Sequence, residues 1–360
     1  MAKAHGPKFR VLCFDGSSAS GGTGYVAIGM LQQIENLLQT AGQKECLLDW
    51  VDVFAGTSAG AANAVLFAMH DNPYDALDGA IDFWKGMLEM SKSGMSVGRE
   101  ISAMVGRSAL VSTVPMQKFL ISHFGESTTL GDLKHKVIIP AFQLDNEEEG
   151  DRRSWKPKIY KNFDEHEEDR DELVVDVVMR SGSPPVLTPI YQGLKKQGPG
   201  FVDGGIYANN PAMVAIAQMY RELRKETNRE HDLLVLSLGN GDAPNYLAPE
   251  LVDGYADWGY APWFLKLSNL GIGMYMILES GLMAIDYECQ VLLGENYRRL
   301  DPHLPHELSL HSGVEIPEVL EMVLSLPECQ KRMREAVGWL TRMGWIPQAA
   351  ATPAAAQKAS

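Results

Sequence analysis

A serine stands between two glycines in the segment Gly56-Thr-Ser58-Ala-Gly60, which is a G-x-S-x-G motif. Glycines at these positions permit the sharp, strained turn that lifts a serine hydroxyl clear of the backbone. A helix that follows such a turn directs its N-terminal amides at negative charge that develops near the serine. The motif therefore indicates nucleophilic acyl transfer by Ser58, with a chance match in a glycine- and alanine-rich chain as the alternative.

A carboxylate occupies a second glycine turn, Asp203-Gly204-Gly205. A carboxylate at the edge of a sheet can approach the loop of another strand and accept a proton there. A lone D-G-G is more often a simple turn, so Asp203 becomes a candidate base only in company with Ser58.

The third motif is the loop from Asp15 to Gly24, which contains four glycines and three serines. Successive small residues expose backbone N–H groups and can form an anion nest at a helix start. Such a nest suits an oxyanion hole or a phosphate. The loop has no G-K-[ST] sequence, so it is not a Walker loop.

Each of these motifs follows a stretch that is expected to be a strand. Apolar runs predict buried strands at 9–14, 52–55 and 233–238, and the apolar pair at 201–202 is read as the end of a strand before Asp203. Helical spacing of apolar residues predicts helices over 26–38 and 61–70. Strands that alternate with helices indicate an α/β fold, with a central, mostly parallel sheet flanked by helices on both faces. Because ligands bind beyond the carboxyl ends of such strands, we expect the motifs to meet there.

The order of the motifs resembles that of the patatin-like phospholipase family. That family has D-G-G-G-x-R-G after its first strand, then G-x-S-x-G, and much later D-G-[GA]. Here the corresponding segments are 15–24, 56–60 and 203–205, and the segment 181–189 resembles the S-A-A-P-x-x-F-P of the family. The resemblance covers about residues 8–240.

The resemblance implies a Ser–Asp dyad that works without a catalytic histidine. Ser58 would be the nucleophile and Asp203 the base, and an acyl-enzyme would form before water releases the fatty acid. The implied substrates are glycerophospholipids or lysophospholipids, with no metal or organic cofactor. The oxyanion hole would consist of amides of Gly16, Ser17, Ser18 and Ala59, and the motifs would be supported by Asp15, Gly56, Gly60, Gly204 and Gly205.

The first loop departs from the family pattern. Ser17 and Ser18 stand where the family has glycines, the run to Gly24 is about three residues longer, and Thr23 stands in the place of the usual Arg. A serine donates its amide as a glycine does. The missing glycines nevertheless reduce backbone freedom, and the missing Arg removes a positive charge.

Two other functions remain open from the sequence. A Ser-Asp-His carboxylesterase acting on soluble esters would need a histidine after Asp203, and the candidates are His231, His303, His306 and His311. The altered first loop instead favours a weakly catalytic regulatory protein that binds a lipid or a nucleotide.

Charge and cysteine usage exclude several classes. The formal net charge is −14 with no Lys/Arg cluster beyond a loose triplet, which argues against nucleic-acid binding. Because the segment 145–172 alone carries −6 of that charge, the remaining surface is less strongly repelled by anionic lipid. The four cysteines form no C-x-x-C pair, and no acidic spacing matches an EF-hand.

We expect a cytoplasmic protein that touches a membrane or micelle surface peripherally, since no apolar run is long enough to span a bilayer. An activator or protein partner is left open. The expected organisation is a catalytic core at 8–240, a helical extension at 241–346 packed on it, and a disordered tail at 347–360. The aromatic and Met-rich stretch 258–285 is either an interfacial lid or acyl channel, or a core helix.

Overall fold

The fold is that of a computed structural model of the chain. The structure describes residues 8–18, 23–93, 109, 111–163, 168–226, 233–242, 259, 263, 272–304 and 316–346.

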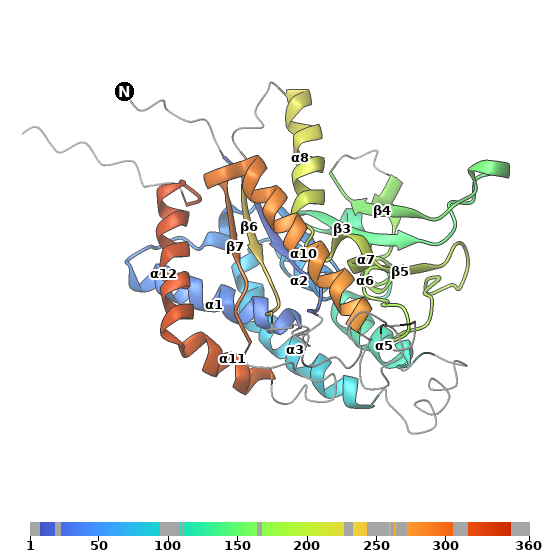
Figure 1. The fold of residues 1–360 in the computed structure, drawn as a ribbon, viewed down its shortest axis with the longest axis horizontal. Helices are drawn as coiled ribbons and strands as arrows, with labels where there is room; N and C mark the ends of the chain where they lie inside the picture. The colour runs from blue at the N-terminus through green and yellow to red at the C-terminus, as the bar shows by residue number, and fades with distance from the viewer. Residues whose placement is uncertain are drawn as a thin grey trace, which may run out of the picture.

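Parallel strands form the centre of the sheet. Strand β1 (Phe9–Phe14) lies between β2 (Val53–Gly56) and β6 (Leu233–Leu238), and β7 (Tyr297–Leu300) extends the sheet beside β6 (Figure 1). All residues of β2 and β6 are buried. Continuous apolar runs of this kind are typical of strands covered on both faces.

The other edge of the sheet is antiparallel. Strand β3 (Lys136–Gln143) runs parallel to β2, and β4 (Lys156–Lys161) pairs antiparallel with β3. Strand β5 (Phe201–Asp203) also pairs antiparallel with β3, beyond the point where β2 ends. The sequence suggested that Asp203 follows a parallel strand, and this prediction was wrong, because β5 is antiparallel to β3. Asp203 reaches the site because β3 is longer than β2 and offers its free edge to β5.

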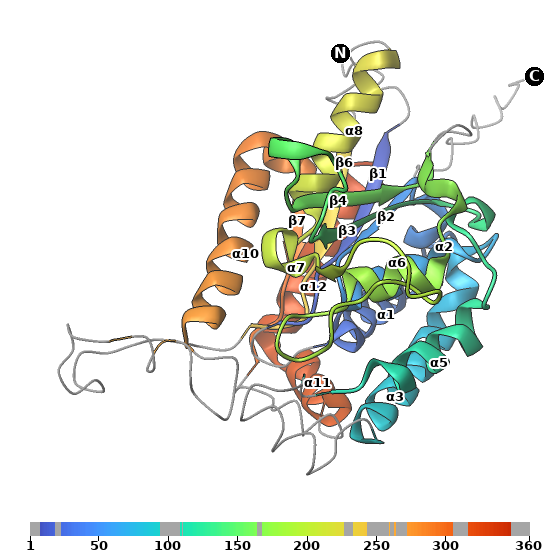
Figure 2. The ribbon, with the colours of Figure 1, turned by 90° about the vertical axis from the view of Figure 1, so that its right-hand side faces the viewer.

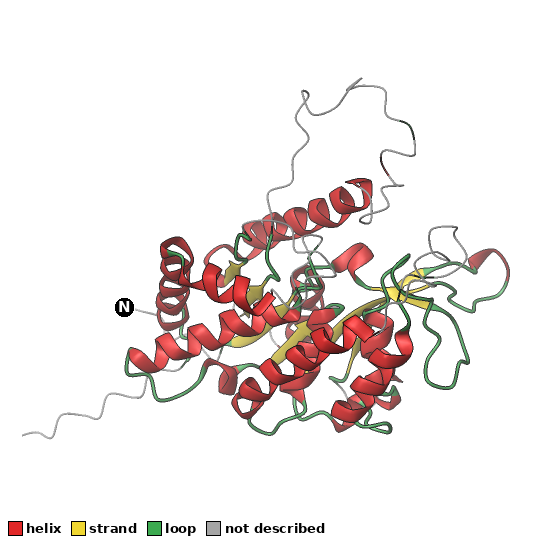
Figure 3. Cartoon of the chain, turned by 90° about the horizontal axis from the view of Figure 1, so that it is seen from below, coloured by secondary structure: helices red, strands yellow, loops and turns green. Residues whose placement is uncertain are grey.

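Helices cover both faces of the sheet, which confirms the predicted fold class (Figures 2 and 3). Helices α8 (Ala212–Glu226) and α10 (Ile272–Leu293) pack on one face. The short α7 (Gly205–Ala208) follows β5. The other face carries α1 (Gly24–Thr40), α2 (Ala59–Ala68), α3 (Ala76–Ser93), α5 (Thr113–Phe124), α6 (Val174–Ser181), α11 (Ile316–Ser325) and α12 (Pro327–Arg342).

An aromatic stack fixes α2 against the strands that carry two of the motifs. The ring of Phe67 on α2 stacks on Phe14 of β1 at 5.6 Å and on Phe54 of β2 at 5.7 Å between centroids. All three side chains are fully buried. Each aromatic pair contributes about 1 kcal/mol beyond its buried area. The stack therefore holds the helix that begins after Ser58 at a fixed distance from the end of β1.

The residues after 240 add a strand that the sequence did not predict. Tyr297-Arg-Arg-Leu300 contains two charged residues, yet it pairs with β6 as β7. The domain limits at 240 and 346 stay predictions, and 347–360 lies outside the described residues. The aromatic stretch 258–285 is described only at 259, at 263 and from 272 onward. No described helix combines the length and the apolar character needed to cross a membrane.

Candidate active site

Ser58 occupies a strained turn between β2 and α2. Its φ of 53° and ψ of −117° lie in a region that glycine favours. A Cβ on Gly56 would lie 1.9 Å from the Gly60 carbonyl oxygen, and one on Gly60 would lie 2.1 Å from the Phe14 oxygen. Both glycines are therefore required, because the turn packs directly against its own helix and against β1.

The side chains of Ser58 and Asp203 form a hydrogen-bonded pair. The Ser58 Oγ–H donates to Asp203 Oδ2 at 2.7 Å, and the Gly205 amide donates to Asp203 Oδ1 at 2.7 Å. One carboxylate oxygen thus faces the hydroxyl while the other is fixed by the backbone. A Cβ on Gly204 would lie 2.3 Å from the Pro140 carbonyl oxygen, so this turn also needs its glycine.

The environment of Asp203 makes its carboxylate a stronger base than usual. The residue is 6% exposed. Burial raises the pKa of the Asp203 carboxyl from 3.8 to about 6, although the hydrogen bonds from Ser58 and Gly205 act in the opposite direction. A base with a pKa near 6 is ionised at neutral pH and still has appreciable proton affinity.

The end of α6 and the residues that follow it contact both halves of this pair. The Ser58 amide donates to Ser181 Oγ at 2.8 Å, and the Ser181 hydroxyl donates to the Pro140 carbonyl at 2.6 Å. The Asp203 amide donates to the Ser183 carbonyl at 2.9 Å. The resemblance at 181–189 was a signal for this segment, but sequence reasoning gave Ser181 no place in the site.

Replacing Ser181 with alanine should therefore slow acyl transfer as well as destabilise the fold. Buried Ser181 loses two hydrogen bonds, which costs about 1–3 kcal/mol in unfolding free energy and frees the Ser58 backbone. We expect the labelling rate of Ser58 by a fluorophosphonate to fall about 10-fold. Ser183→Ala is the matched control, because the buried Ser183 hydroxyl bonds only the Met179 carbonyl among the described residues. Equal labelling rates in the two variants would contradict the role of Ser181.

The first loop lies against the nucleophile. A Cβ on Gly16 would lie 3.3 Å from Ser58 Cβ and 2.1 Å from Asn209 Oδ1. The Gly16 amide, which the sequence placed in the oxyanion hole, donates instead to the Asn209 carbonyl at 2.9 Å. Asn240 Nδ2 donates to the carbonyls of Asp15 and Gly16 at 2.8 and 2.9 Å.

These contacts determine where the next amides point. In a trans peptide the N–H and C=O of one unit point in opposite directions. The Gly16 carbonyl accepts from Asn240, so the Ser17 amide faces away from Asn240. The Ser17 carbonyl accepts from Asn209 Nδ2 at 3.3 Å, so the Ser18 amide faces away from Asn209. Residues 19–22 lie outside the described residues.

The histidine alternative gains no geometric support. Within the described part of the chain, the Asp203 carboxylate accepts hydrogen bonds from Ser58 and Gly205 and from no histidine. His303 is exposed, and its Nδ1 lies 3.1 Å from Asp242 Oδ1. The other histidine candidates, at 231, 306 and 311, lie outside the described residues.

The fold agrees with the comparison to known families. The sequence profile described as patatin-like phospholipase matches residues 12–216, which is more than half of the chain. The chain therefore belongs to the patatin-like phospholipase family. The family includes lipid-hydrolysing enzymes, and this supports a lipid hydrolase.

Individual relatives are distant but span most of the chain. A cGAMP-activated phospholipase of Escherichia coli is 24% identical over 84% of this chain and 82% of its own length. Protein teg of Priestia megaterium is 26% identical over 83% of this chain and 89% of its own length. Among solved structures, VipD of Legionella pneumophila matches with a TM-score of 0.42 and 13% identity over 92% of this chain and 67% of that one.

Proposed function

We propose that this protein is a serine acyl hydrolase that cleaves fatty-acyl ester bonds of phospholipids or lysophospholipids through a Ser58–Asp203 dyad. The observation that carries the proposal is the 2.7 Å hydrogen bond from the Ser58 hydroxyl to the buried Asp203 carboxylate, with the Ser58 backbone in a strained turn. Hydroxyl, base and strained turn together are what nucleophilic acyl transfer requires.

In the first half-reaction, Ser58 Oγ attacks the ester carbonyl carbon while its proton passes to Asp203 Oδ2. The tetrahedral intermediate collapses, the bond from carbon to the alcohol oxygen breaks, and that oxygen takes the proton from Asp203. In the second half-reaction, water gives a proton to Asp203 and attacks the acyl-enzyme. The fatty acid leaves, and Ser58 recovers its proton from Asp203.

The negative charge on the tetrahedral oxygen needs backbone donors. We assign them to Ser17, Ser18 and Ala59. The carbonyl contacts of the first loop orient the first two amides, and Ala59 is the first residue of α2, so its amide has no partner within the helix. Gly16 is needed because it has no side chain: a Cβ at this position would crowd Ser58.

A lipid substrate is supported by the family and by the names of the relatives. The E. coli relative is named as a phospholipase that cGAMP activates, which supports a phospholipid substrate and makes a nucleotide activator worth testing here. We propose peripheral contact with a lipid surface, because the substrate lies in one.

Release of fatty acid from micelles tests this function. Phosphatidylcholine and lysophosphatidylcholine in mixed micelles, each with and without cGAMP, are compared with p-nitrophenyl acetate as a soluble ester. We expect free fatty acid from at least one lipid, measured by mass spectrometry, with His303→Gln as active as the wild type. Hydrolysis of the soluble ester alone, or a loss of turnover in His303→Gln, would favour the carboxylesterase.

A further inference from the structure

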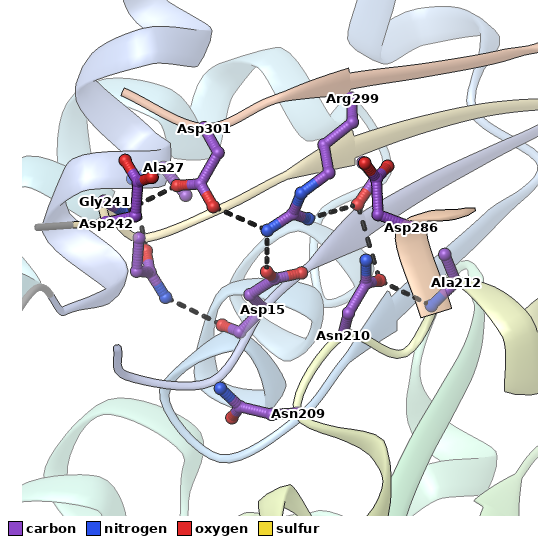
Figure 4. A network of polar contacts seen from close by, with 12 residues as sticks. Asp15, Ala27, Asn209, Asn210, Ala212, Gly241, Asp242, Asp286, Arg299 and Asp301 are labelled. Atoms are coloured by element: carbon purple, nitrogen blue, oxygen red, sulfur yellow. Dashed lines mark hydrogen bonds and ion pairs between the residues drawn. The ribbon is translucent and has the colours of Figure 1, made fainter. Parts of the chain in front are cut away.

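A largely buried arginine from the C-terminal part of the chain reaches the first loop. Arg299 lies on β7, opposite Ser237 of β6, and its side chain is 11% exposed. Its Nη2 donates to Asp15 Oδ2 at 2.7 Å and to Asp301 Oδ2 at 2.6 Å, and its Nη1 donates to Ser237 Oγ at 3.0 Å. Figure 4 shows the guanidinium between the two carboxylates.

The first contact holds the start of the loop. Asp15 is 2% exposed, and its amide donates to the Leu238 carbonyl at 3.0 Å. Burial raises the pKa of the Asp15 carboxyl to about 7, while the Arg299 charge acts in the opposite direction. A buried carboxylate that loses its cationic partner is destabilised or takes up a proton, so Arg299 fixes the Asp15 side chain in its charged form, while the Leu238 carbonyl and Asn240 hold the Asp15 backbone.

A second route reaches the same loop from the opposite side. The Ser237 hydroxyl donates to Asn210 Oδ1 at 3.4 Å, and that oxygen also accepts from the Ala212 amide at 2.9 Å. The neighbouring Asn209 holds the Gly16 amide and the Ser17 carbonyl. Arg299 is thus connected both to Asp15 directly and to the segment that binds the loop after Asp15.

We propose that Arg299 is a positioning residue of the acyl-transfer site, which fixes the backbone of residues 15–18 so that the Ser17 and Ser18 amides face the reacting carbonyl. The first loop lacks the Arg of the family motif, and in this chain β7 brings a cation to the loop from outside it. Because the inference rests on the proposed function, its test must separate the loss of positioning from the absence of acyl transfer.

A cavity makes a sharp test possible. It has a volume of about 880 Å³, and its lining includes Asp15, Gly16, Ser18 and Arg299. Helices α10 and α12 also contribute side chains to the lining. Truncation of Arg299 would leave a space of the shape of a guanidinium beside Asp15, and a small cation from solution could enter it through the cavity.

The experiment compares Arg299→Ala, Arg299→Lys and Arg298→Ala in the full chain, with a short p-nitrophenyl ester as substrate. We expect kcat to fall about 100-fold in Arg299→Ala with KM unchanged within about 3-fold, since a misplaced catalytic group costs about that much. Lysine keeps the charge but not the planar fork, so Arg299→Lys should lose about 10-fold. Arg298 donates to Glu335 of α12 at 3.1 Å, and Arg298→Ala should keep kcat within about 2-fold of the wild-type value.

Guanidinium chloride at about 20 mM is the decisive addition. It should raise the kcat of Arg299→Ala at least 5-fold and leave the kcat of Arg298→Ala unchanged. A merely destabilised protein would not show this recovery. If Arg299→Ala is too unstable to purify, Arg299→Lys carries the test. Wild-type kcat in Arg299→Lys, or no recovery of Arg299→Ala with guanidinium, would overturn the positioning role while the wild type still labels at Ser58. A wild type without any Ser58 labelling or turnover would overturn the proposed function and this inference together.

Discussion

Replacing Ser58 with alanine should reduce hydrolysis of any ester substrate by about 10⁴-fold or more and remove covalent labelling by a fluorophosphonate. The reason is that the Ser58 hydroxyl is the only group in the site that we assign to form the acyl-enzyme. Turnover is measured on the best lipid or ester substrate, and labelling is measured by intact mass. Residual activity within about 10-fold of the wild type would show that another group carries the reaction.

The stability of the Ser58 variants provides the control for folding. A non-glycine residue at φ 53° and ψ −117° costs about 1–3 kcal/mol, which Ser58→Gly relieves. We expect urea denaturation to show Ser58→Gly to be about 1 kcal/mol more stable than Ser58→Ala, with both variants inactive. A Ser58→Gly variant that unfolds more readily than Ser58→Ala would contradict strain at this turn.

Replacing Asp203 with asparagine should lower kcat by about 10³-fold while the fold is retained. An asparagine Oδ1 still accepts from the Gly205 amide, but the amide group opposite Ser58 cannot take a proton from the hydroxyl. Burst kinetics on a p-nitrophenyl ester separate the acylation step from later steps. A burst rate like that of the wild type would show that Asp203 is not the base.

The pH dependence of the wild type follows from the same carboxylate. Burial raises the pKa of Asp203 to about 6, and the base works in its ionised form, so kcat/KM should rise with pH through about 6 and then level off. The limb near pH 6 should be absent from the residual activity of Asp203→Asn. If kcat/KM rises near pH 6 in both proteins, the titrating group is not Asp203.

Stability should change with pH in the opposite sense. Because the pKa of Asp203 is higher in the folded chain than its ordinary value near 3.8, folding takes up a proton between about pH 4 and pH 6. The contribution of Asp203 to stability is therefore full below pH 4 and is lost as pH rises through 6, by about 3 kcal/mol in total. Relative to the wild type, Asp203→Asn should gain unfolding free energy between pH 4.5 and pH 7.5. The unfolding free energies are measured by urea denaturation at both pH values. If the difference in unfolding free energy between Asp203→Asn and the wild type is the same at pH 4.5 and pH 7.5, the Asp203 carboxyl is not desolvated.

Local patterns were sufficient to predict the sheet centre and to single out Ser58 as a candidate nucleophile. The apolar runs at 9–14 and 233–238 and the glycines around Ser58 are local features with direct structural consequences. The position of Asp203 relative to Ser58 was available only from the family resemblance, since the two residues lie 145 positions apart. The antiparallel pairing of β5 depends on the lengths of β2 and β3, which alternation of residue types does not encode.

Apart from the family resemblance at 181–189, the residues that fix the geometry of the site carry no comparable signal. Ser181, Asn209 and Asn240 are single polar residues in loops or at a helix end, and no spacing rule distinguishes them from turn formers. Arg299 contacts Asp15, which lies 284 positions away in the sequence. The two arginines of β7 interrupt the apolar pattern from which a strand would be predicted. The cytoplasmic location, the domain limits and the donors of the oxyanion hole stay predictions.

The most direct test of the Ser58–Asp203 dyad is the intact mass of the protein after reaction with a fluorophosphonate probe. We expect one adduct on the wild type, located on Ser58 by peptide mapping, no adduct on Ser58→Ala, and formation slowed by at least about 100-fold on Asp203→Asn. An adduct on a different residue, or one that forms on Asp203→Asn as fast as on the wild type, would contradict the dyad.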